Sequence, residues 1–567
     1  MRLFGFKLFN EFNWGCFGIA LALAFLAGCA AQGGPGGGPV DRTGPELVSC
    51  YPEDGATGVA GRPEIVFQFS EPLDTRALDN ILQVTPRLST APRVIIRRRK
   101  VIIKLNEPLQ PDRTYIFNFG RNLVDYQKNP TAREIKLAFA TGDSLDQGVI
   151  AGRISDIPTN SKTEVWLYKK GTDFPDTLWL AEPDFVVSVD IDGNYQATNL
   201  PLGEYRALAV SGERPRPKFL TENDWLAPPQ VENLSIKNRN DRLDNIGFRL
   251  TKMYWKPFRL LIAKPLDGLL ELNFSRPLSN MRLTPDNFIF SDARIKVIHA
   301  WADEKEATRI LLLTDSLISK TEYYISVSGI VAENADSLII AGRTARFSWT
   351  DQPDTLKAKI ASSIPAANAK EVELITVIQV NLSEPISGDT LAAHVELFFN
   401  DTLKVPIKAQ WIDANSFTVE PQQPLLSATN YALNLNAKSW LDYAGNQFQD
   451  SLFALRFSTI DGNLFGTVSG KVVTFGDIDP QNLIIEANLT GARSFQRQTR
   501  IDSTGFYKLE DLAPGKYTFS IWEDRNNDEQ YDFGRLIPYI PAEPYRVYRE
   551  QINVRSRWET AEVNWEF

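Results

Sequence analysis

The fold of this chain is decided by a short stretch near its start, Ile65-Val66-Phe67-Gln68-Phe69-Ser70-Glu71-Pro72-Leu73. Bulky apolar side chains fall on every second position from Ile65 to Phe69, which is the period of a strand with one buried face. Pro72 then ends the strand, because proline has no N–H group to donate to a sheet. The same ending recurs twice, as Phe274-Ser275-Arg276-Pro277-Leu278 and Leu382-Ser383-Glu384-Pro385-Ile386. The chain therefore contains three copies of one β unit.

Two further markers follow the proline in every copy. The first is a leucine followed by a threonine and a tyrosine, at residues 109–115, 317–323 and 425–431. The second is a closing aromatic strand, at residues 139–143, 347–351 and 457–461. A tyrosine in this position predicts a tyrosine corner, where the phenol group pins a strand crossing. About 100 residues with some seven short strands are typical of an immunoglobulin-like sandwich.

A second type of repeat occupies the remaining sequence. One copy begins at residues 149–154, continues through Asp192-Gly193-Asn194-Tyr195 and ends at residues 202–208. The other begins at residues 464–468, continues through Ser503-Thr504-Gly505-Phe506-Tyr507 and ends at residues 512–519. The glycines predict hairpin turns and the strands after them predict core strands. This repeat also indicates a small β-sandwich.

Composition limits the function. The chain has 567 residues, of which 43% are apolar, so it is long enough for several domains with real cores. Its net charge of −9 argues against nucleic acid as a partner. Only two histidines occur, and the sequence lacks the usual nucleophile-elbow, phosphate-loop and zinc-protease motifs. We therefore expect a protein that is not an enzyme, with a hydrolase built on a disguised site as the least favoured alternative.

The amino terminus has the pattern of a signal peptide. Arg2 and Lys7 precede an apolar run over residues 17–26, which is too short to span a bilayer permanently. Leu26-Ala27-Gly28-Cys29 follows, and it resembles a bacterial lipobox. The resemblance implies that residues 1–28 are removed and that Cys29 carries the lipid. An ordinary signal peptide with a chance cysteine is the alternative. Residues 29–43, rich in glycine and proline, predict a flexible tether.

The three Ig-like copies resemble the SbsA-type bacterial Ig-like domain. The middle copy departs from the pattern, since it lacks the turn seen at Pro52–Ala56 and Pro365–Ala369 and has Arg276 where the others have glutamate. The second repeat type resembles the prealbumin-like, carboxypeptidase regulatory-like fold. The whole layout resembles outer-membrane lipoproteins of Bacteroidota.

The expected fold is all-β, with tandem sandwiches behind a lipoprotein signal peptide. The expected Ig-like domains span residues 44–145, 253–352 and 353–460, and the expected prealbumin-like domains span residues 146–252 and 461–567.

One acidic segment is a candidate metal site. Oxygen-bearing side chains fall on every second residue at Asp524, Asn526, Asp528, Gln530 and Asp532, which resembles the start of an EF-hand calcium loop. The segment departs from that loop because Glu529 stands where a glycine is needed and Arg535 where the last glutamate is needed. Calcium is thus a possible cofactor, and an acidic hairpin loop without an ion is the alternative.

Three other features favour structural interpretations. The Asp-Tyr segments at residues 125–129 and 442–446 predict Asx-type turns rather than a metal site. Arg97-Arg98-Arg99-Lys100 predicts a hairpin tip rather than a binding patch. Eight tryptophans are candidates for sugar-stacking platforms or for core residues, and the core is favoured: Trp166, Trp179, Trp225, Trp255, Trp301, Trp411, Trp440 and Trp522.

These observations favour a structural or adhesive cell-envelope lipoprotein. The alternative is a carbohydrate- or peptide-binding lipoprotein of a transport or degradation system. The expected partners are the membrane, through the lipid, and a protein or glycan of the envelope. By the same resemblance, Ala30 after the lipid-bearing cysteine implies the outer membrane, facing the periplasm or the surface.

Overall fold

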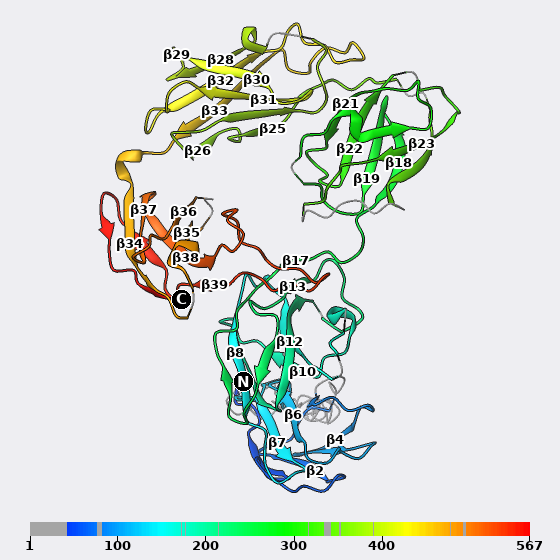
Figure 1. The fold of residues 1–567 in the computed structure, drawn as a ribbon, viewed down its shortest axis with the longest axis vertical. Coiled ribbons are helices and arrows are strands. Elements are labelled where there is room, and N and C mark those ends of the chain that lie inside the picture. The colour runs from blue at the N-terminus through cyan, green and yellow to red at the C-terminus, as the bar shows by residue number, and fades with distance from the viewer. Residues whose placement is uncertain are drawn as a thin grey trace, which may run out of the picture. The chain divides into compact units, whose positions relative to one another are not determined.

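The computed structural model describes residues 42–75, 82–171, 173–175, 177–213, 215–279, 281–315, 317–333, 342–350, 353–388, 391–476, 478–491 and 495–567. Its regular elements there are β-strands and 3-10 helices of a single turn (Figure 1). The prediction of an all-β fold is therefore confirmed. No helix in this described part is long and apolar enough to cross a membrane. The chain divides into two compact units, residues 1–148 with 199–201 and residues 149–198 with 202–567.

The first unit contains a seven-stranded sandwich. One of its sheets has the order β1-β2-β5-β4 and the other β3-β6-β7. Ile65, Phe67 and Phe69 of the fold-deciding stretch are at most 1% exposed, and they pack in one core with Phe117 and Phe119. The strands are β1 (Leu47–Tyr51), β2 (Ile65–Phe69), β3 (Gln83–Thr85), β4 (Arg93–Arg97), β5 (Lys100–Lys104), β6 (Thr114–Gly120) and β7 (Ile135–Ala140).

The middle copy, in the second unit, repeats this topology. Its sheets have the orders β18-β19-β22-β21 and β20-β23-β24, and Leu270, Leu272 and Ile310 are fully buried between them. The elements are β18 (Leu260–Leu266), β19 (Leu269–Phe274), η2 (Pro285–Asn287), β20 (Phe288–Phe290), β21 (Val297–Ala302), β22 (Arg309–Thr314), β23 (Glu322–Val327) and β24 (Thr344–Ser348).

The third copy adds two strands to the same plan. Its sheets have the orders β25-β27-β31-β30 and β26-β33-β32-β28-β29. Trp440 is 1% exposed and contacts the rings of Trp411, Phe417 and Phe448 in the core. The elements are β25 (Ile360–Ile364), β26 (Ala369–Val372), β27 (Ile378–Leu382), η4 (Leu391–Ala393), β28 (Val395–Phe399), β29 (Leu403–Val405), β30 (Ile407–Trp411), β31 (Ser416–Pro421), β32 (Asn430–Asn436) and β33 (Leu452–Thr459).

The predicted tyrosine corner is present in all three copies. The phenol oxygen of Tyr115, Tyr323 or Tyr431 accepts the backbone N–H of the residue five positions earlier. The N···O distances are 2.8, 3.1 and 2.8 Å in chain order. A recurring bond of this kind satisfies a backbone donor that the strand crossing removes from the sheets.

The second repeat type also occurs as two copies with one topology. In the first copy, β9 and β12 form the centre of one sheet, and β8 pairs with β11 and, in parallel, with β15 and β16. The elements are β8 (Gly148–Ser155), β9 (Lys162–Lys169), η1 (Leu178–Leu180), β10 (Phe185–Ser188), β11 (Asn194–Leu200), β12 (Gly203–Gly212), β13 (Trp225–Ala227), β14 (Leu234–Ile236), β15 (Arg242–Leu243), β16 (Phe248–Arg249) and β17 (Thr251–Lys252).

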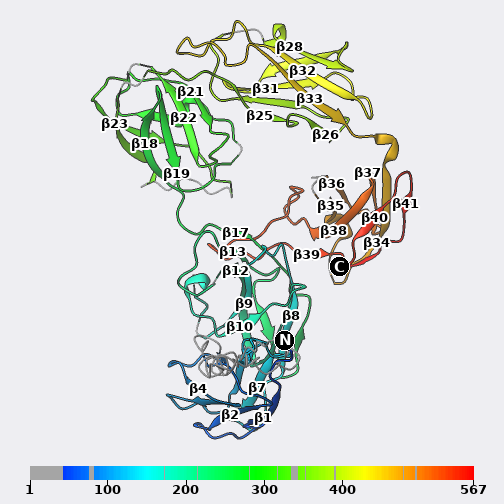
Figure 2. The same cartoon turned by 180° about the vertical axis from the view of Figure 1, so that it is seen from behind.

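The carboxyl-terminal copy has the same strand order except that its described residues lack a counterpart of β17, with β35 and β38 at the centre of one sheet and β34 pairing with β37, β41 and β42 (Figure 2). The elements are η5 (Gly462–Leu464), β34 (Gly466–Val473), η6 (Pro480–Asn482), β35 (Leu483–Leu489), β36 (Gln496–Arg500), β37 (Phe506–Leu512), β38 (Gly515–Glu523), β39 (Tyr545–Val547), β40 (Ile552–Val554), β41 (Glu559–Thr560) and β42 (Trp565–Glu566).

The same close backbone approach marks both copies. A Cβ atom on Gly152 would lie 1.9 Å from the carbonyl oxygen of Ile246, and one on Gly470 would lie 2.0 Å from that of Val563. These carbonyls also accept hydrogen bonds from Tyr195 and Tyr507 at 2.8 and 2.7 Å. Glycine is therefore required where β8 and β34 pass these carbonyls.

Candidate functional site

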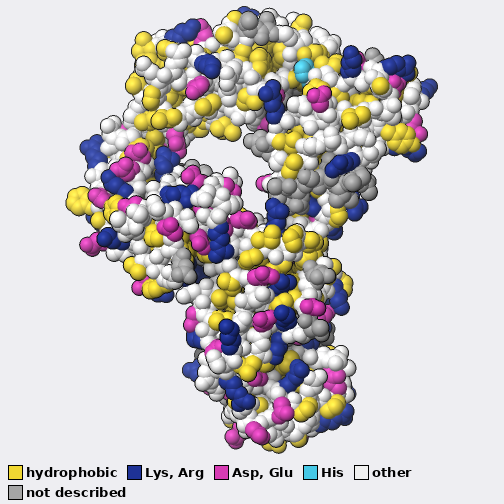
Figure 3. Space-filling view, viewed as in Figure 1, with side chains coloured by type: hydrophobic (Ala, Val, Ile, Leu, Met, Phe, Trp, Pro, Cys, Tyr) yellow, Lys and Arg dark blue, Asp and Glu magenta, His cyan; other side chains and the backbone are white. Residues whose placement is uncertain are grey.

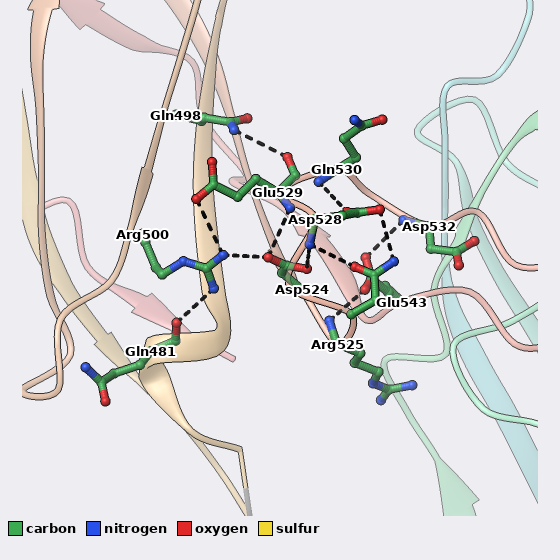
Figure 4. Close-up of polar contacts among 11 residues, drawn as sticks. Gln481, Gln498, Arg500, Asp524, Arg525, Asp528, Glu529, Gln530, Asp532 and Glu543 are labelled. Atoms are coloured by element: carbon green, nitrogen blue, oxygen red, sulfur yellow. Dashed lines mark hydrogen bonds and ion pairs between the residues drawn. The ribbon is translucent and has the colours of Figure 1, made fainter. Parts of the chain in front are cut away.

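The acidic segment 524–532 follows β38 directly and is closed by its own hydrogen bonds (Figure 4). Asp524 is fully buried, and its Oδ2 lies 2.6 Å from Nη2 of Arg500 on β36. The same carboxylate accepts the backbone N–H groups of Asp528 and Glu529, each at 3.2 Å. Asp524 therefore already has a cationic partner and two further donors, which is how a buried carboxylate is stabilised without a metal.

Of the other predicted ligands, Asp528 and Asp532 also accept N–H groups. Asp528 accepts the side-chain amide of Asn526 at 3.1 Å and the backbone N–H of Gln530 at 2.8 Å. Asp532 accepts the backbone N–H of Gly534 at 2.9 Å. These bonds hold the turn in shape and use oxygen lone pairs that a calcium ion would need.

Glu543 closes the loop from its other end. Its two carboxylate oxygens accept the backbone N–H groups of Arg525 and Asp532 at 2.7 and 2.9 Å (Figure 4). Burial raises the pKa of Glu543, with Asp524 and Asp532 adding to the effect and the two hydrogen bonds opposing it. The loop is thus a hydrogen-bonded structure around two buried carboxylates.

Beyond the acidic turn, residues 531–545 pack against the domain that contains β9 and β12. Phe533, Leu536 and Tyr539 join a hydrophobic cluster whose members include Trp166 and Trp179. The Tyr539 hydroxyl donates to the carbonyl oxygen of Ala207 on β12 at 3.0 Å. The acidic turn therefore precedes a segment that packs on the other domain. The spacing of its oxygens did not indicate this structural role.

Asp524, Asp528 and Asp532 do not form a group of three acidic side chains with neighbouring oxygens among the described residues. Among the residues that the structure describes, one group of three carboxylates brings an oxygen from each within 4.8 Å of the others, and it consists of Asp354, Glu384 and Asp442. All three lie in the third Ig-like copy. Calcium binding by the segment 524–532 stays a prediction, and the geometry favours its alternative, a loop without an ion.

The remaining sequence predictions have mixed outcomes. Cys29 and most of the tether lie outside the described residues. Arg97 and Lys100 pair across the tip of the β4–β5 hairpin, as expected for a solvated turn. Both Asp-Tyr segments are turns closed by the aspartate side chain, because Asp125 and Asp442 accept the backbone N–H four residues later, each at 2.8 Å.

The tryptophans are mainly core residues. Trp166, Trp179, Trp301, Trp440 and Trp522 are at most 4% exposed. Trp225, Trp255 and Trp411 are partly buried. The core interpretation therefore holds, and no row of exposed indoles is formed by these eight. Over the visible face of the molecule, basic and acidic side chains are interspersed, without a large patch of either sign (Figure 3).

The group of Asp354, Glu384 and Asp442 was missed by the sequence analysis. Two signals for it were available. Glu384 belongs to the Ser-Glu-Pro stretch that marks the repeat, and Asp442 belongs to the Asp-Tyr segment shared with the first copy. Their proximity depends on the bridge that pairs Ile386 with Asp442, which a single sequence does not show.

The comparisons with known proteins identify the domain class. Residues 41–141 and 354–459 match the model of the bacterial Ig-like domain family. These two regions, less than half of the chain, are thus similar to bacterial Ig-like domains, and the chain as a whole consists of tandem β-sandwiches. No curated protein shows significant sequence similarity to the chain.

Several solved structures share local likeness. An LD transpeptidase in complex with imipenem is 12% identical over 24% of this chain and 56% of its own, with a TM-score of 0.15. Domains 1–6 of the surface layer protein SbsC are 10% identical over 90% of this chain and 67% of their own, with a TM-score of 0.17. The Bacteroides ovatus glucan-utilization protein SGBP-B, in complex with a mixed-linkage heptasaccharide, is 10% identical over 70% of this chain and 89% of its own, with a TM-score of 0.17. The first match spans little more than half of that enzyme, and TM-scores this low carry no argument about this chain.

Proposed function

We propose that this chain is a non-catalytic cell-envelope lipoprotein of the outer membrane whose tandem sandwiches have a structural or adhesive role. One observation carries the proposal, namely that bacterial Ig-like domains follow a segment ending in Leu26-Ala27-Gly28-Cys29. Small residues before the cysteine leave the backbone open to a peptidase, and the thiol is the acceptor for lipid.

The physical basis of the anchor is the burial of acyl chains. Each buried methylene contributes about 0.8 kcal/mol, so two or three chains on Cys29 suffice for stable attachment. The glycine- and proline-rich residues that follow have an r.m.s. reach of roughly 20 Å, which separates the first sandwich from the lipid headgroups.

Metabolic labelling tests the anchor. The full-length chain is expressed in a bacterium with lipoprotein processing and fed an alkyne analogue of palmitate. We expect label in the wild-type protein and in the membrane fraction, and loss of both in the variant Cys29→Ala. Cys50→Ala is the matched control and keeps the label. A wild-type chain without label, recovered in the soluble fraction, contradicts the proposal.

A second experiment addresses the role of the domains. Crosslinking in intact cells is expected to capture envelope proteins, as a structural or adhesive lipoprotein requires. A glycan array probed with the purified chain is expected to show no selective binding. Selective binding to one glycan class on the array overturns the structural role in favour of a carbohydrate-binding lipoprotein.

A further inference from the structure

Three carboxylates from distant parts of the third Ig-like copy meet at one place. Asp354 precedes β25, Glu384 follows β27, and Asp442 lies in the Asx-type turn after β32. One carboxylate oxygen of each lies within 4.8 Å of the other two. Glu384 and Asp442 are 8% and 2% exposed, while Asp354 is partly exposed. The group is therefore shielded from water on the side of the sheets and open at Asp354.

One oxygen in this group lacks a partner. Asp442 accepts the backbone N–H of Asn446 through Oδ1 at 2.8 Å, whereas its buried Oδ2 has no hydrogen-bond donor. Within the described residues, none of the three carboxylates forms an ion pair with a lysine or arginine. A buried carboxylate oxygen without a donor is costly, and a water molecule, a proton or a cation would each satisfy it.

The electrostatics of the group agree with this conclusion. Burial raises the pKa of Glu384 to about 8, and the charges of Asp354 and Asp442 add to the effect. Burial also raises the pKa of Asp354, with Asp442 and Asp267 contributing. Lys357 and Lys359 line the cavity of about 310 Å³ beside Asp354 and Glu384 without pairing with either acid. The raised pKa values thus reflect burial together with repulsion among the carboxylates, and a bound cation would relieve that repulsion.

The middle copy shows a different solution at the same place. The bonds that pair Ser275 with Arg259 and Ser383 with Lys359 are equivalent in the two copies, with N···O distances of 3.0 and 3.1 Å. By this alignment the middle copy has Arg276 in place of Glu384 and Tyr254 in place of Asp354.

The residue of the middle copy that corresponds to Asp442 is identified by the isolated β-bridges. Leu278 pairs with Ala332 as Ile386 pairs with Asp442, so the middle copy has alanine in place of the unpartnered aspartate. The guanidinium of Arg276 lies 5.4 Å from the centre of the Tyr254 ring. The middle copy therefore has the guanidinium of Arg276 over an aromatic ring at the place where the third copy has three carboxylates.

The first copy has an acid at all three positions, Asp41, Glu71 and Asp125, of which Asp41 lies outside the described residues. There both oxygens of Asp125 accept from Asn129, at 2.8 and 2.9 Å. In the third copy the side chain of Asn446 donates instead to the carbonyl oxygen of Asp354, at 3.3 Å. This change of partner leaves Oδ2 of Asp442 available to a ligand.

We propose that Asp354, Glu384 and Asp442 form a divalent-cation site that takes calcium. The donors are all carboxylate oxygens, which favours a hard cation over the transition metals that histidine or cysteine would select. Calcium takes six to eight oxygens, and water at the open side beside Asp354 completes its coordination. A bound ion would connect the segment before β25, where the third copy begins, to the end of β27.

Calorimetric titration tests the site. The purified full-length chain is freed of metal with a chelator and titrated with calcium chloride, and its unfolding is followed with and without calcium. We expect one saturable calcium site in this copy and a higher Tm with calcium. Glu384→Gln and Asp442→Asn should weaken that binding at least tenfold, while Asp528→Asn in the segment 524–532 leaves it unchanged.

The charge-removing variants also distinguish a cation site from a purely structural cluster. We expect both Glu384→Gln and Asp442→Asn to unfold at the wild-type temperature or above it without calcium, since each removes repulsion, and to lose the increase in Tm that calcium gives the wild type. Absence of binding at millimolar calcium overturns the proposal. So does binding that survives in both variants, or that is lost only in Asp528→Asn.

Discussion

The chain contains two groups of acidic residues that differ in how their charge is neutralised. In the segment 524–532, the buried Asp524 pairs with Arg500 and accepts two backbone N–H groups. In the third Ig-like copy, Glu384 and Asp442 are almost as buried, and no basic side chain pairs with them among the described residues. The number and spacing of acids are therefore not enough to predict a cation site. The N–H groups and basic side chains around the carboxylates must be known as well.

The largest effect is expected from breaking the neutralised group. Arg500→Leu leaves Asp524 buried with only backbone donors, so the free energy of unfolding of the carboxyl-terminal domain should fall by about 3 kcal/mol. Urea denaturation of the chain, followed by tryptophan fluorescence, measures this. Arg525→Leu is the matched control, because Arg525 pairs with Glu523 at the surface, and it should change the free energy by less than about 1 kcal/mol. Equal effects of the two variants contradict the account.

The opposite sign is expected in the third Ig-like copy. Glu384→Arg introduces the cation that the middle copy has at Arg276, so it should raise stability without calcium by about 1 kcal/mol. For a domain of this size that corresponds to a Tm increase of roughly 4–8 °C. Calorimetry with and without calcium measures both the increase and the loss of calcium dependence. A large decrease in Tm contradicts this expectation.

The tyrosine corners provide a feature that the copies share. Tyr431→Phe and Tyr323→Phe each leave one backbone N–H without its acceptor, and each should cost about 1 kcal/mol. Because the bond is the same in both copies, the two losses should agree within experimental error whether or not calcium is present. A loss in Tyr431→Phe that depends on calcium shows that the cation site and the corner are coupled.

The last prediction concerns the dependence of stability on pH. The pKa of Glu384 is raised to about 8 in the folded chain, above its value of about 4.3 in an unfolded chain. The folded state then holds the extra proton between these values, so its stability decreases as pH rises through this window. Without calcium, Glu384→Gln should remove part of the decrease between pH 5 and pH 8. An unchanged slope in this variant contradicts the assignment.

The sequence was sufficient to predict the sandwiches because their signals are local. Alternation from Ile65 to Phe69, the proline after it and the tyrosine of each corner all act within a few residues of their place in the chain. The topology of the second repeat type also follows its local markers, since Tyr195 and Tyr507 both reach a carbonyl that passes beside a glycine.

The sites were harder to predict because they depend on distant partners. The segment 524–532 looked like a calcium loop, and only the fold brings Arg500 to Asp524. Conversely, Asp354, Glu384 and Asp442 are far apart in the chain, and they meet because Ile386 bridges to Asp442 and β25 pairs with β27. The docking of Tyr539 against Ala207 joins positions even further apart.

The central claim is that a calcium ion binds the carboxylates without internal partners and is not bound by the hydrogen-bonded loop. The most direct measurement is anomalous diffraction from crystals of the full-length chain grown with calcium. The account predicts an anomalous peak among the oxygens of Asp354, Glu384 and Asp442 and no peak within residues 524–532. A peak within that loop, or an empty difference map at the three carboxylates, contradicts it.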